Sequence, residues 1–513
     1  MTIESLDIDE ERVGKALYDY QHDAIDTIFE RLKNFPEGHN LLYQLPTGGG
    51  KTVIFSEIAR RYIKESGKKV LILTHRIELC SQTSNMLVEF GVKNKIINSK
   101  VKLLPDQHEY MCFVAMVETL NNRLQDEKLD IDNIGLVIID EAHYNSFRKL
   151  FQYFDKSDIL GVTATPLSSN VKLPMKDNYH ELVVGHSIAE LIQKGFLSKA
   201  NTYSYDVHLG SLKIGIDGDY TVSSSDRLYS SHTMQEKLIE AYKERALGKK
   251  TLIFNNGIST SRHVYSVFRK AGFEIEHLDN THSEQERRDI LTWFKNKPDA
   301  ILTSVGILTT GFDEPTVEAI ILNRATKSLT LYHQMIGRGS RILPNKSEFS
   351  IIDLGNNVLR FGLWDSYVDW HSIFRSPDNY LQNLSSDTEI ERQFKYRMPD
   401  WLRARLSKSE NLDFDMQQVY MEVGKQGLRP ILAIERAVEQ HASVCFENSD
   451  SYEEAMRLVN YLNEDIEYRV KQYCYSIAKC TDNYVSWLQD EYKRKLSVIL
   501  NRKFIMMDSL AVD

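Results

Sequence analysis

The stretch PTGGGKT, from Pro46 to Thr52, constrains this chain more than any other. It follows an apolar run at 41–43 and precedes a helix-like segment at 53–64. A glycine-rich turn between a strand and a helix points backbone N–H groups at an anion, and the helix N-terminus adds partial positive charge. The stretch therefore predicts a phosphate-binding loop, with a flexible surface turn as the alternative.

Each side chain of this loop has an expected task. Lys51 would reach the β- and γ-phosphates of ATP, and the Thr52 hydroxyl would bind Mg²⁺. The glycines let the backbone turn tightly around the phosphates. The residues expected to surround the nucleotide are Thr47, Gly48, Gly49, Gly50, Lys51 and Thr52.

Length and composition bound the class of protein. A chain of 513 residues exceeds what one core organises and predicts about three domains. Five widely spread cysteines indicate neither a disulfide framework nor a zinc site. The net charge of −9 argues against a protein that coats nucleic acid, although it leaves room for a local basic cleft. With no signal-peptide pattern and no apolar run of ~20 residues, we expect a cytoplasmic setting of bacterial or viral type, compatible with a nucleoid.

Apolar strands alternate with helical patterns after the loop. Such alternation predicts a parallel sheet covered on both faces, which binds ligands at the carboxyl ends of its strands. Polar clusters follow directly on each expected strand. These strands lie at 70–73, 113–117, 136–139 and 159–162.

Asp140 and Glu141 are the most informative of these polar residues. Two carboxylates directly after a buried aliphatic run are costly to desolvate without a counter-charge, and Mg²⁺ would supply one. Asp140 would hold the metal and Glu141 would polarise the attacking water. A solvated acidic turn is the alternative.

A second strand-and-helix region follows, and it has no phosphate loop of its own. Its strands are expected at 251–254, 274–278, 300–303 and 319–322. Arg338 and Arg341, three residues apart, would share one helical face and converge on one anion. Arginines supplied across a cleft stabilise the charge that develops on a transferred phosphoryl group. Paired arginines in surface salt bridges are the alternative.

The roles of Gln21 and of the C-terminal third of the chain stay open at this point. Gln21 reads equally well as an adenine-reading amide and as a polar residue at a helix start. Helices with apolar stripes are expected at 431–442, 451–463 and 483–500. Aromatic and basic residues interleave at 468–473 and 492–495, which suits stacking on bases but more often marks an amphipathic helix with a solvated basic face.

These motifs, in this order, carry a resemblance to a known family. GGGKT, DEAH at 140–143 and TATP at 163–166 are similar to motifs I, II and III of a superfamily 2 DEAH-type helicase. QMIGRGSR at 334–341 resembles motif VI, and the segment 305–315 resembles motif V. The wording around motifs V and VI is similar to RadD-like and UvsW-like DNA repair and branch-migration helicases.

The resemblance implies further roles. Thr163 and Thr165 would couple hydrolysis to lobe movement, and His143 would bridge towards the second lobe. Gly311 and Asp313 would link the nucleotide to the bound strand, and Gln334 belongs to motif VI beside the arginines. The residues implied to face nucleic acid, or to lie in the motifs that do, are Thr74, His75, Arg76, Thr119, Asn255 and Thr309.

We therefore expect an α/β protein with two tandem RecA-like parallel-sheet lobes and a mainly helical C-terminal accessory domain. The expected boundaries are 1–171, 172–365 and 366–513. The expected function is an ATP- and Mg²⁺-dependent helicase or translocase that acts on nucleic acid, with single-stranded, forked or branched DNA favoured. Three alternatives stay open: an RNA helicase, a double-strand DNA motor subunit of a restriction or defence complex, and an ATP-gated nucleic-acid-binding scaffold.

Overall fold

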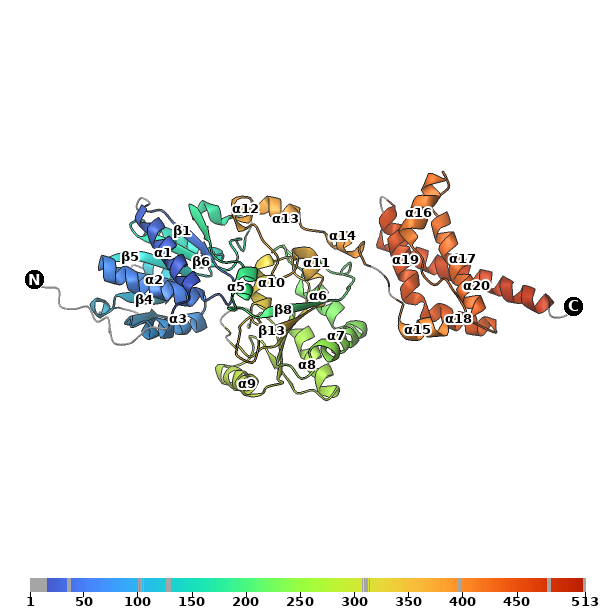
Figure 1. The fold of residues 1–513 in the computed structure, drawn as a ribbon, viewed down its shortest axis with the longest axis horizontal. Helices are drawn as coiled ribbons and strands as arrows, with labels where there is room; N and C mark the ends of the chain where they lie inside the picture. Colours follow the sequence, from blue (N-terminus) through green and yellow to red (C-terminus); the bar gives the residue numbers. More distant parts are fainter. Residues whose placement is uncertain are drawn as a thin grey trace, which may run out of the picture. The chain divides into compact units, whose positions relative to one another are not determined.

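The computed structural model describes residues 16–34, 38–99, 101, 104, 106–125, 131–170, 172–306, 308, 312, 314–394, 396, 398–477 and 481–510. Its internal contacts divide the chain into two units, Met1–Ser385 and Ser386–Asp513. Two parallel sheets, each with its helices, make up the first unit, and helices make up the described part of the second (Figure 1). The predicted fold class is therefore confirmed.

The first lobe is organised by a sheet with seven strands among the described residues. Its order is β3-β4-β2-β5-β6-β1-β7, and neighbouring strands pair in parallel. The strands are β1 (Leu41–Gln44), β2 (Lys69–Thr74), β3 (Asn94–Ile97), β4 (Cys112–Met116), β5 (Ile134–Asp140), β6 (Asp158–Thr163) and β7 (Glu181–Val184).

The second lobe has a parallel sheet of six strands within the described ranges. Its order is β10-β11-β9-β12-β13-β8, which places the strand predicted at 274–278 at an edge, as β10. The strands are β8 (Lys199–Ser204), β9 (Thr251–Asn255), β10 (Ile275–Leu278), β11 (Ile301–Ser304), β12 (Ala319–Asn323) and β13 (Glu348–Asp353).

Helices cover these sheets, and this cover explains the apolar strands. The central strands β2, β5, β9 and β12 are buried along most or all of their length, as parallel strands with helices on both faces must be. The helices of the first lobe are α1 (Asp19–Asn34), α2 (Lys51–Ser66), α3 (Ile77–Glu89), α4 (Val117–Gln125), η1 (Gln107–Glu109), η2 (Asn145–Tyr153) and η3 (Met175–Asp177). Those that follow, up to the end of the first unit, are α5 (Ile188–Gln193), α6 (Val222–Tyr229), α7 (His232–Arg245), α8 (Ile258–Lys270), α9 (Glu284–Asn296), α10 (Leu329–Ile336), α11 (Asn357–Phe361), α12 (Trp370–Arg375) and α13 (Pro377–Gln382).

The chain passes between the lobes twice. A linker, residues 185–198, contains α5 and leads from β7 to β8. A strap, residues 364–376, follows the last strand of the second lobe and returns to the first, where α12 contacts β7 and η3. Lys176 Nζ donates a hydrogen bond to the Arg375 carbonyl at 2.7 Å. The strap therefore ties the end of the second lobe to the edge of the first sheet.

The second unit is a bundle around its own apolar core. The sequence predicted three of its helices, α17, α18 and α20, but not α16 or α19. Its helices are α14 (Asp387–Glu391), α15 (Asp400–Arg405), α16 (Met416–Lys425), α17 (Leu432–Glu447), α18 (Tyr452–Tyr461), α19 (Asn463–Ser476) and α20 (Asp482–Leu510).

The predicted domain boundaries, 1–171, 172–365 and 366–513, stay predictions. The structure gives three related findings. The strand β7 belongs to the first sheet although it follows residue 171. The division between the two compact units falls after Ser385, not at 365. None of the described helices is both long and apolar enough to span a bilayer.

A buried polar network crosses the bundle core. His441 Nε2 lies 3.0 Å from Asp465 Oδ2, and the Tyr492 hydroxyl lies 2.8 Å from His441 Nδ1. The Arg469 guanidinium donates two hydrogen bonds to Asp465, at 3.1 and 2.9 Å. Since Arg469, Tyr473 and Tyr492 are 1%, 3% and 0% exposed, this part of the interleaved pattern belongs to the core and is not available to stack on bases.

We expect His441 to make the stability of the second unit pH-dependent. Burial lowers its pKa from 6.5 to about 4; the Arg469 charge acts in the same direction and Asp465 opposes it. Between about pH 6.5 and pH 4, the unfolded chain is therefore protonated at His441 while the folded unit is not. The free energy of unfolding is highest above pH 6.5 and falls as the pH falls towards 4, by at most about 1.4 kcal/mol per pH unit.

Urea unfolding of the full chain between pH 7 and 4 measures this effect. His441→Gln should flatten the decline in the free energy of unfolding because glutamine does not titrate. His263→Gln, at an exposed position on α8, is the matched control and should keep the wild-type slope. A wild-type slope in His441→Gln would contradict the assignment.

Candidate active site

The glycine loop connects β1 to α2, and its backbone takes conformations that favour glycine. Gly48 has φ +87° and Gly50 has φ +83°. A Cβ on Gly50 would lie 2.5 Å from Gln21 Nε2. The Tyr20 hydroxyl donates a hydrogen bond to the Gly49 carbonyl at 2.8 Å. The α1 side chains therefore press on a loop that has no room for a larger residue.

Lys51 is the first residue of α2, and its ammonium turns back under the loop. Nζ donates to the carbonyls of Leu45 at 3.2 Å and Pro46 at 3.4 Å. Desolvation lowers the pKa of Lys51, while the charges of Glu141 and Asp140 act to raise it. The ammonium therefore lies within electrostatic reach of both carboxylates.

Asp140 and Glu141 lie at the carboxyl end of β5 and are 6% and 9% exposed. Asp140 Oδ1 accepts a hydrogen bond from the Glu141 N–H at 2.9 Å. Desolvation, with the Glu141 charge, raises the pKa of Asp140 to about 7. Desolvation also acts to raise the pKa of Glu141, but the positive charges of His143, Lys51 and Arg338 outweigh it and that pKa is lowered. The site therefore holds adjacent carboxylates in contrasting environments.

The backbone at Glu141 is strained. Its φ is +51°, in the left-handed region that residues other than glycine seldom adopt. The Glu141 carbonyl accepts from the Tyr144 N–H at 3.1 Å, and the Ala142 N–H donates to the Val162 carbonyl at 3.0 Å. Strain of this kind persists where the surroundings over-determine it, which is common at functional sites.

His143 and the two threonines after β6 form a chain of contacts. His143 Nδ1 lies 3.0 Å from Thr163 Oγ1 and 3.4 Å from Glu141 Oε2. Desolvation lowers the pKa of His143, and the Glu141 charge acts to raise it. Thr165 Oγ1 donates to Thr330 Oγ1 of the second lobe at 2.8 Å. Thr165, two residues beyond the Thr163 that contacts His143, therefore makes a side-chain bond across the lobes.

The second lobe meets the glycine loop through α10 and the turn after it. A Cβ on Gly337 would lie 2.6 Å from Thr47 Cβ, so the Gly337 backbone packs directly against the Thr47 side chain. Arg338 Nη1 donates to the Phe312 carbonyl at 2.6 Å. Desolvation lowers the pKa of Arg338 to about 10, and the Glu141 charge acts to raise it. Both Arg338 and Arg341 act to lower the pKa of Lys51, which places their charges near the loop.

Two of the residues expected at a nucleic-acid surface are buried instead. Thr74 is 0% exposed, and its hydroxyl lies 2.9 Å from Cys80 Sγ. Asn255 is 1% exposed, and its amide donates to Thr303 Oγ1 at 2.8 Å. Each side chain lies at the carboxyl end of its own β-strand and is buried there. Neither is accessible to bound nucleic acid in this conformation.

The other predicted residues divide between the surface and the site. Thr119 is half-buried near the start of α4. His75 is half-buried with its ring 4.1 Å from the ring of Tyr144, and burial lowers its pKa to about 4. Arg76 acts on the pKa of both His75 and Arg338, so it lies near the lobe interface. Thr309, Gly311 and Asp313 lie outside the described residues.

Tyr144 is the residue that the sequence did not single out. Its ring lies 4.3 Å from that of His143. Burial raises the pKa of its hydroxyl and Gln334 of the second lobe acts to lower it, so Tyr144 lies near the lobe interface. The contacts of His143 with Thr163, Glu141 and Tyr144 lie within the first lobe, and its expected bridge towards the second lobe stays a prediction. Only its position in the sequence could have indicated that Tyr144 belongs to the site, because it directly follows the DEAH stretch.

The residues present fit a nucleotide and Mg²⁺. Glycines at φ +87° and +83° let the loop backbone turn tightly, as a loop around phosphates requires. Thr47 Oγ1 is buried and makes no hydrogen bond within the described part of the chain. The carboxylates of Asp140 and Glu141 lie near Lys51 and offer hard oxygen ligands. Two parallel-sheet lobes that meet over one phosphate loop are the architecture of the two-lobed P-loop ATPases.

Comparison with known proteins places the chain within this class. Residues 14–168 match the family described as type III restriction enzyme, res subunit, and residues 233–343 match the helicase conserved C-terminal domain. The putative ATP-dependent helicase IRC3 of Saccharomyces cerevisiae is 32% identical over 358 residues, which are 66% of this chain and 51% of that protein. The chain belongs to the superfamily 2 helicases.

Two further likenesses agree with the fold. A 51.5 kDa protein of a Lactococcus phage is 30% identical over 65% of this chain and 69% of its own length. A fragment of a putative HsdR subunit of a type I restriction enzyme from Vibrio vulnificus aligns with a TM-score of 0.54 at 21% identity, over 68% of this chain and 67% of that one. The chain spans about half the length of the yeast relative IRC3. The closer likeness to RadD-like and UvsW-like helicases stays a prediction.

We expect Gly50→Ala to destabilise the first lobe by more than its backbone conformation alone explains. Alanine in the left-handed region costs roughly 1–2 kcal/mol, and the new Cβ would in addition displace the Gln21 amide. Gly67→Ala is the matched control, since Gly67 has φ +64° and nothing within 4 Å of an added Cβ. Urea unfolding without nucleotide compares the two, and equal losses would show that the loop tolerates the side chain.

Proposed function

We propose that this chain is an ATP- and Mg²⁺-dependent motor that moves along nucleic acid. One observation carries the proposal: charged groups from both lobes converge on a single glycine loop. Lys51, Asp140 and Glu141 come from the first lobe, and the arginines after α10 act on the pKa of Lys51 from the second. Sites with groups from both lobes respond to the nucleotide by changing how the lobes meet.

Each residue would have a defined task in phosphate transfer. The backbone of Gly48, Gly49 and Gly50 would surround the phosphates, with Lys51 on the β- and γ-groups. Thr52 and Asp140 would hold Mg²⁺, which supplies positive charge against the phosphate oxygens when bound. Glu141 would orient and polarise the attacking water. Positioning and charge stabilisation carry this reaction, so the protein needs little covalent chemistry.

The second lobe would complete the site. Arg338 and Arg341 would stabilise the charge that develops on the γ-phosphate, the task of an arginine finger. Arg338 would exchange its bond to the Phe312 carbonyl for one to the phosphate. The Thr165–Thr330 bond would report that change between the lobes, and its loss on opening would shift the grip on the bound strand.

We propose that the motor moves along DNA and acts inside the cell. The match of residues 14–168 to a restriction-enzyme family supports DNA over RNA. The same match favours a second candidate, a motor that moves along double-stranded DNA without separating it. The first candidate is a helicase that separates strands. A role in DNA repair or branch remodelling, which the resemblance to RadD-like and UvsW-like helicases implies, is proposed for that candidate alone.

Lys51→Ala and Glu141→Gln should abolish turnover and leave the fold intact. Loss of the residue that polarises water costs about 10²–10⁴ in rate, so phosphate release with Glu141→Gln should fall by that factor. Lys64→Ala, at an exposed position near the other end of α2, is the matched control and should keep wild-type turnover. Steady-state phosphate release with saturating DNA measures the effect, and circular dichroism checks the fold.

Either variant at full nucleic-acid-stimulated turnover would refute the site. A wild-type chain that binds DNA and ATP but releases phosphate no faster than Glu141→Gln would be an ATP-gated scaffold instead of a motor. The same assay therefore separates these two classes of protein.

Phosphate release should be stimulated more by DNA than by RNA of the same sequence. A panel of single, forked and branched strands in both chemistries measures the preference. Strand displacement would support a helicase, whereas triplex displacement without strand separation would support the double-strand motor. Stimulation by RNA alone would overturn the choice of track.

A further inference from the structure

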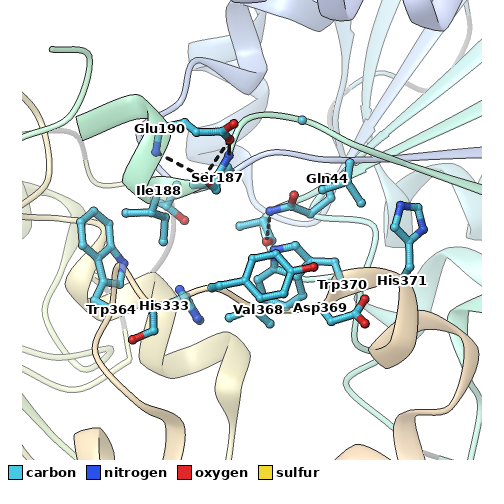
Figure 2. Close-up of a pocket in the computed structure, with 17 residues that line it drawn as sticks. Gln44, Ser187, Ile188, Glu190, His333, Trp364, Val368, Asp369, Trp370 and His371 are labelled. Carbon is cyan, nitrogen blue, oxygen red and sulfur yellow. Dashed lines mark hydrogen bonds between the residues drawn. The ribbon is translucent and has the colours of Figure 1, made fainter. Parts of the chain in front are cut away.

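A cavity of about 350 Å³ lies between the two lobes, next to the glycine loop but outside the cluster of charges. Its walls come from the end of β1, the linker, α10 and the strap (Figure 2). The 17 residues that line it include neither Lys51 nor the carboxylates after β5 nor the two arginines. Its volume is in the range of sites for small molecules.

Rings dominate the walls of this cavity. Trp364 and Trp370 of the strap are 1% and 9% exposed, and His333 of α10 is 6% exposed. Tyr367 lies at the rim with 85% of its surface exposed. Val184 of β7, Ile188 of the linker and Val368 of the strap also line it. A flat ligand would gain the most contact with such walls, since aromatic rings prefer to stack or to meet edge to face.

Gln44 gives the cavity a directed polar group. The side chain is 1% exposed, and its Nε2 donates to the Ala164 carbonyl at 3.0 Å. That bond fixes the amide, while Oε1 is buried and accepts no hydrogen bond within the described residues. Buried acceptors of this kind are normally satisfied, so a ligand N–H fits at Gln44.

The charge at the rim of the cavity further limits the class of ligand that would bind. Glu190 and Asp369 are exposed carboxylates that line the opening, one on the linker and one on the strap. Both cap helices, which keeps them in place. Negative charge from both sides of the opening disfavours an anion and is compatible with a neutral or cationic molecule.

We propose that this cavity is a regulatory site for a neutral or cationic planar heteroaromatic molecule with an N–H donor directed at Gln44 Oε1. The site is distinct from that of ATP, whose triphosphate the rim carboxylates would repel.

Its walls explain how an occupant would act on the motor. The cavity joins Thr47 of the glycine loop, Ala164 of the TATP stretch and His333 of the arginine-bearing segment. The first two belong to one lobe and the third to the other, so the cavity exists only while the lobes keep this arrangement. A ligand that binds one arrangement better shifts the population towards it. The occupant would therefore slow lobe movement, a consequence that rests on the proposed function, whereas binding itself does not.

Isothermal titration of the full chain with indole tests the binding. Indole is neutral, planar and carries one N–H, and 1-methylindole has the same rings without the donor. Indole should bind about fivefold more tightly, the effect of one neutral hydrogen bond. Indole-3-acetate should bind more weakly than indole because of the rim carboxylates.

Two variants locate the site. Gln44→Met keeps the side-chain volume and should remove the difference between indole and 1-methylindole. Tyr367→Ala should weaken both ligands without affecting the fold, since that ring is 85% exposed. Tyr461→Ala, a 42% exposed tyrosine of the second unit, is the matched control and should bind indole as the wild type does.

Equal affinities for indole and 1-methylindole in the wild type would overturn the proposal. So would indole binding that is unchanged in Tyr367→Ala, or that is lost when a non-hydrolysable ATP analogue saturates the chain. Bound indole should lower the maximal rate of DNA-stimulated phosphate release without raising the KM for ATP. Phosphate release without indole tests the proposed function separately, so failure of one is not failure of the other.

Discussion

The structure depends on the burial of two carboxylates opposite buried positive charge. Asp140 and Glu141 follow a strand that is almost completely enclosed, where an uncompensated charge is prohibitively costly. Lys51 supplies compensation from the same lobe, and Arg338 supplies it from the other. Because part of the counter-charge is on a separate sheet, the arrangement of the lobes and the ionisation of the site depend on each other.

Two chain segments, together with a few polar bonds, govern how the lobes meet. The linker and the strap both cross between the sheets, and a single hydroxyl pair, Thr165 and Thr330, joins them near the loop. A net hydrogen bond is worth about 1 kcal/mol, so such contacts can break and re-form as the occupancy of the site changes. The cavity beside the glycine loop is lined by residues of both crossing segments.

The second unit uses buried charge differently. In its bundle, Asp465 lies between His441 and Arg469, and Tyr492 extends the network. Removing one member would leave the others buried and unpaired, at a cost of about 3–5 kcal/mol. Such a network fixes the register of α17, α19 and α20. The residues at 468–473 were expected on an amphipathic helix with a solvated basic face, whereas Arg469 and Tyr473 are buried in the bundle core.

The sequence by itself determined the class of fold and the chemistry expected of the loop, because both follow from local order. Runs of aliphatic residues fix parallel strands, and the polar residues after β1, β5 and β6 must then share one edge of a sheet. The tertiary structure alone decided the rest. It buried Thr74 and Asn255, which sequence placed at a surface, and it brought Tyr144, beside His143, close to Gln334 of the second lobe. Burial and cross-lobe contact depend on residues far apart in the chain, and local pattern carries no information about them.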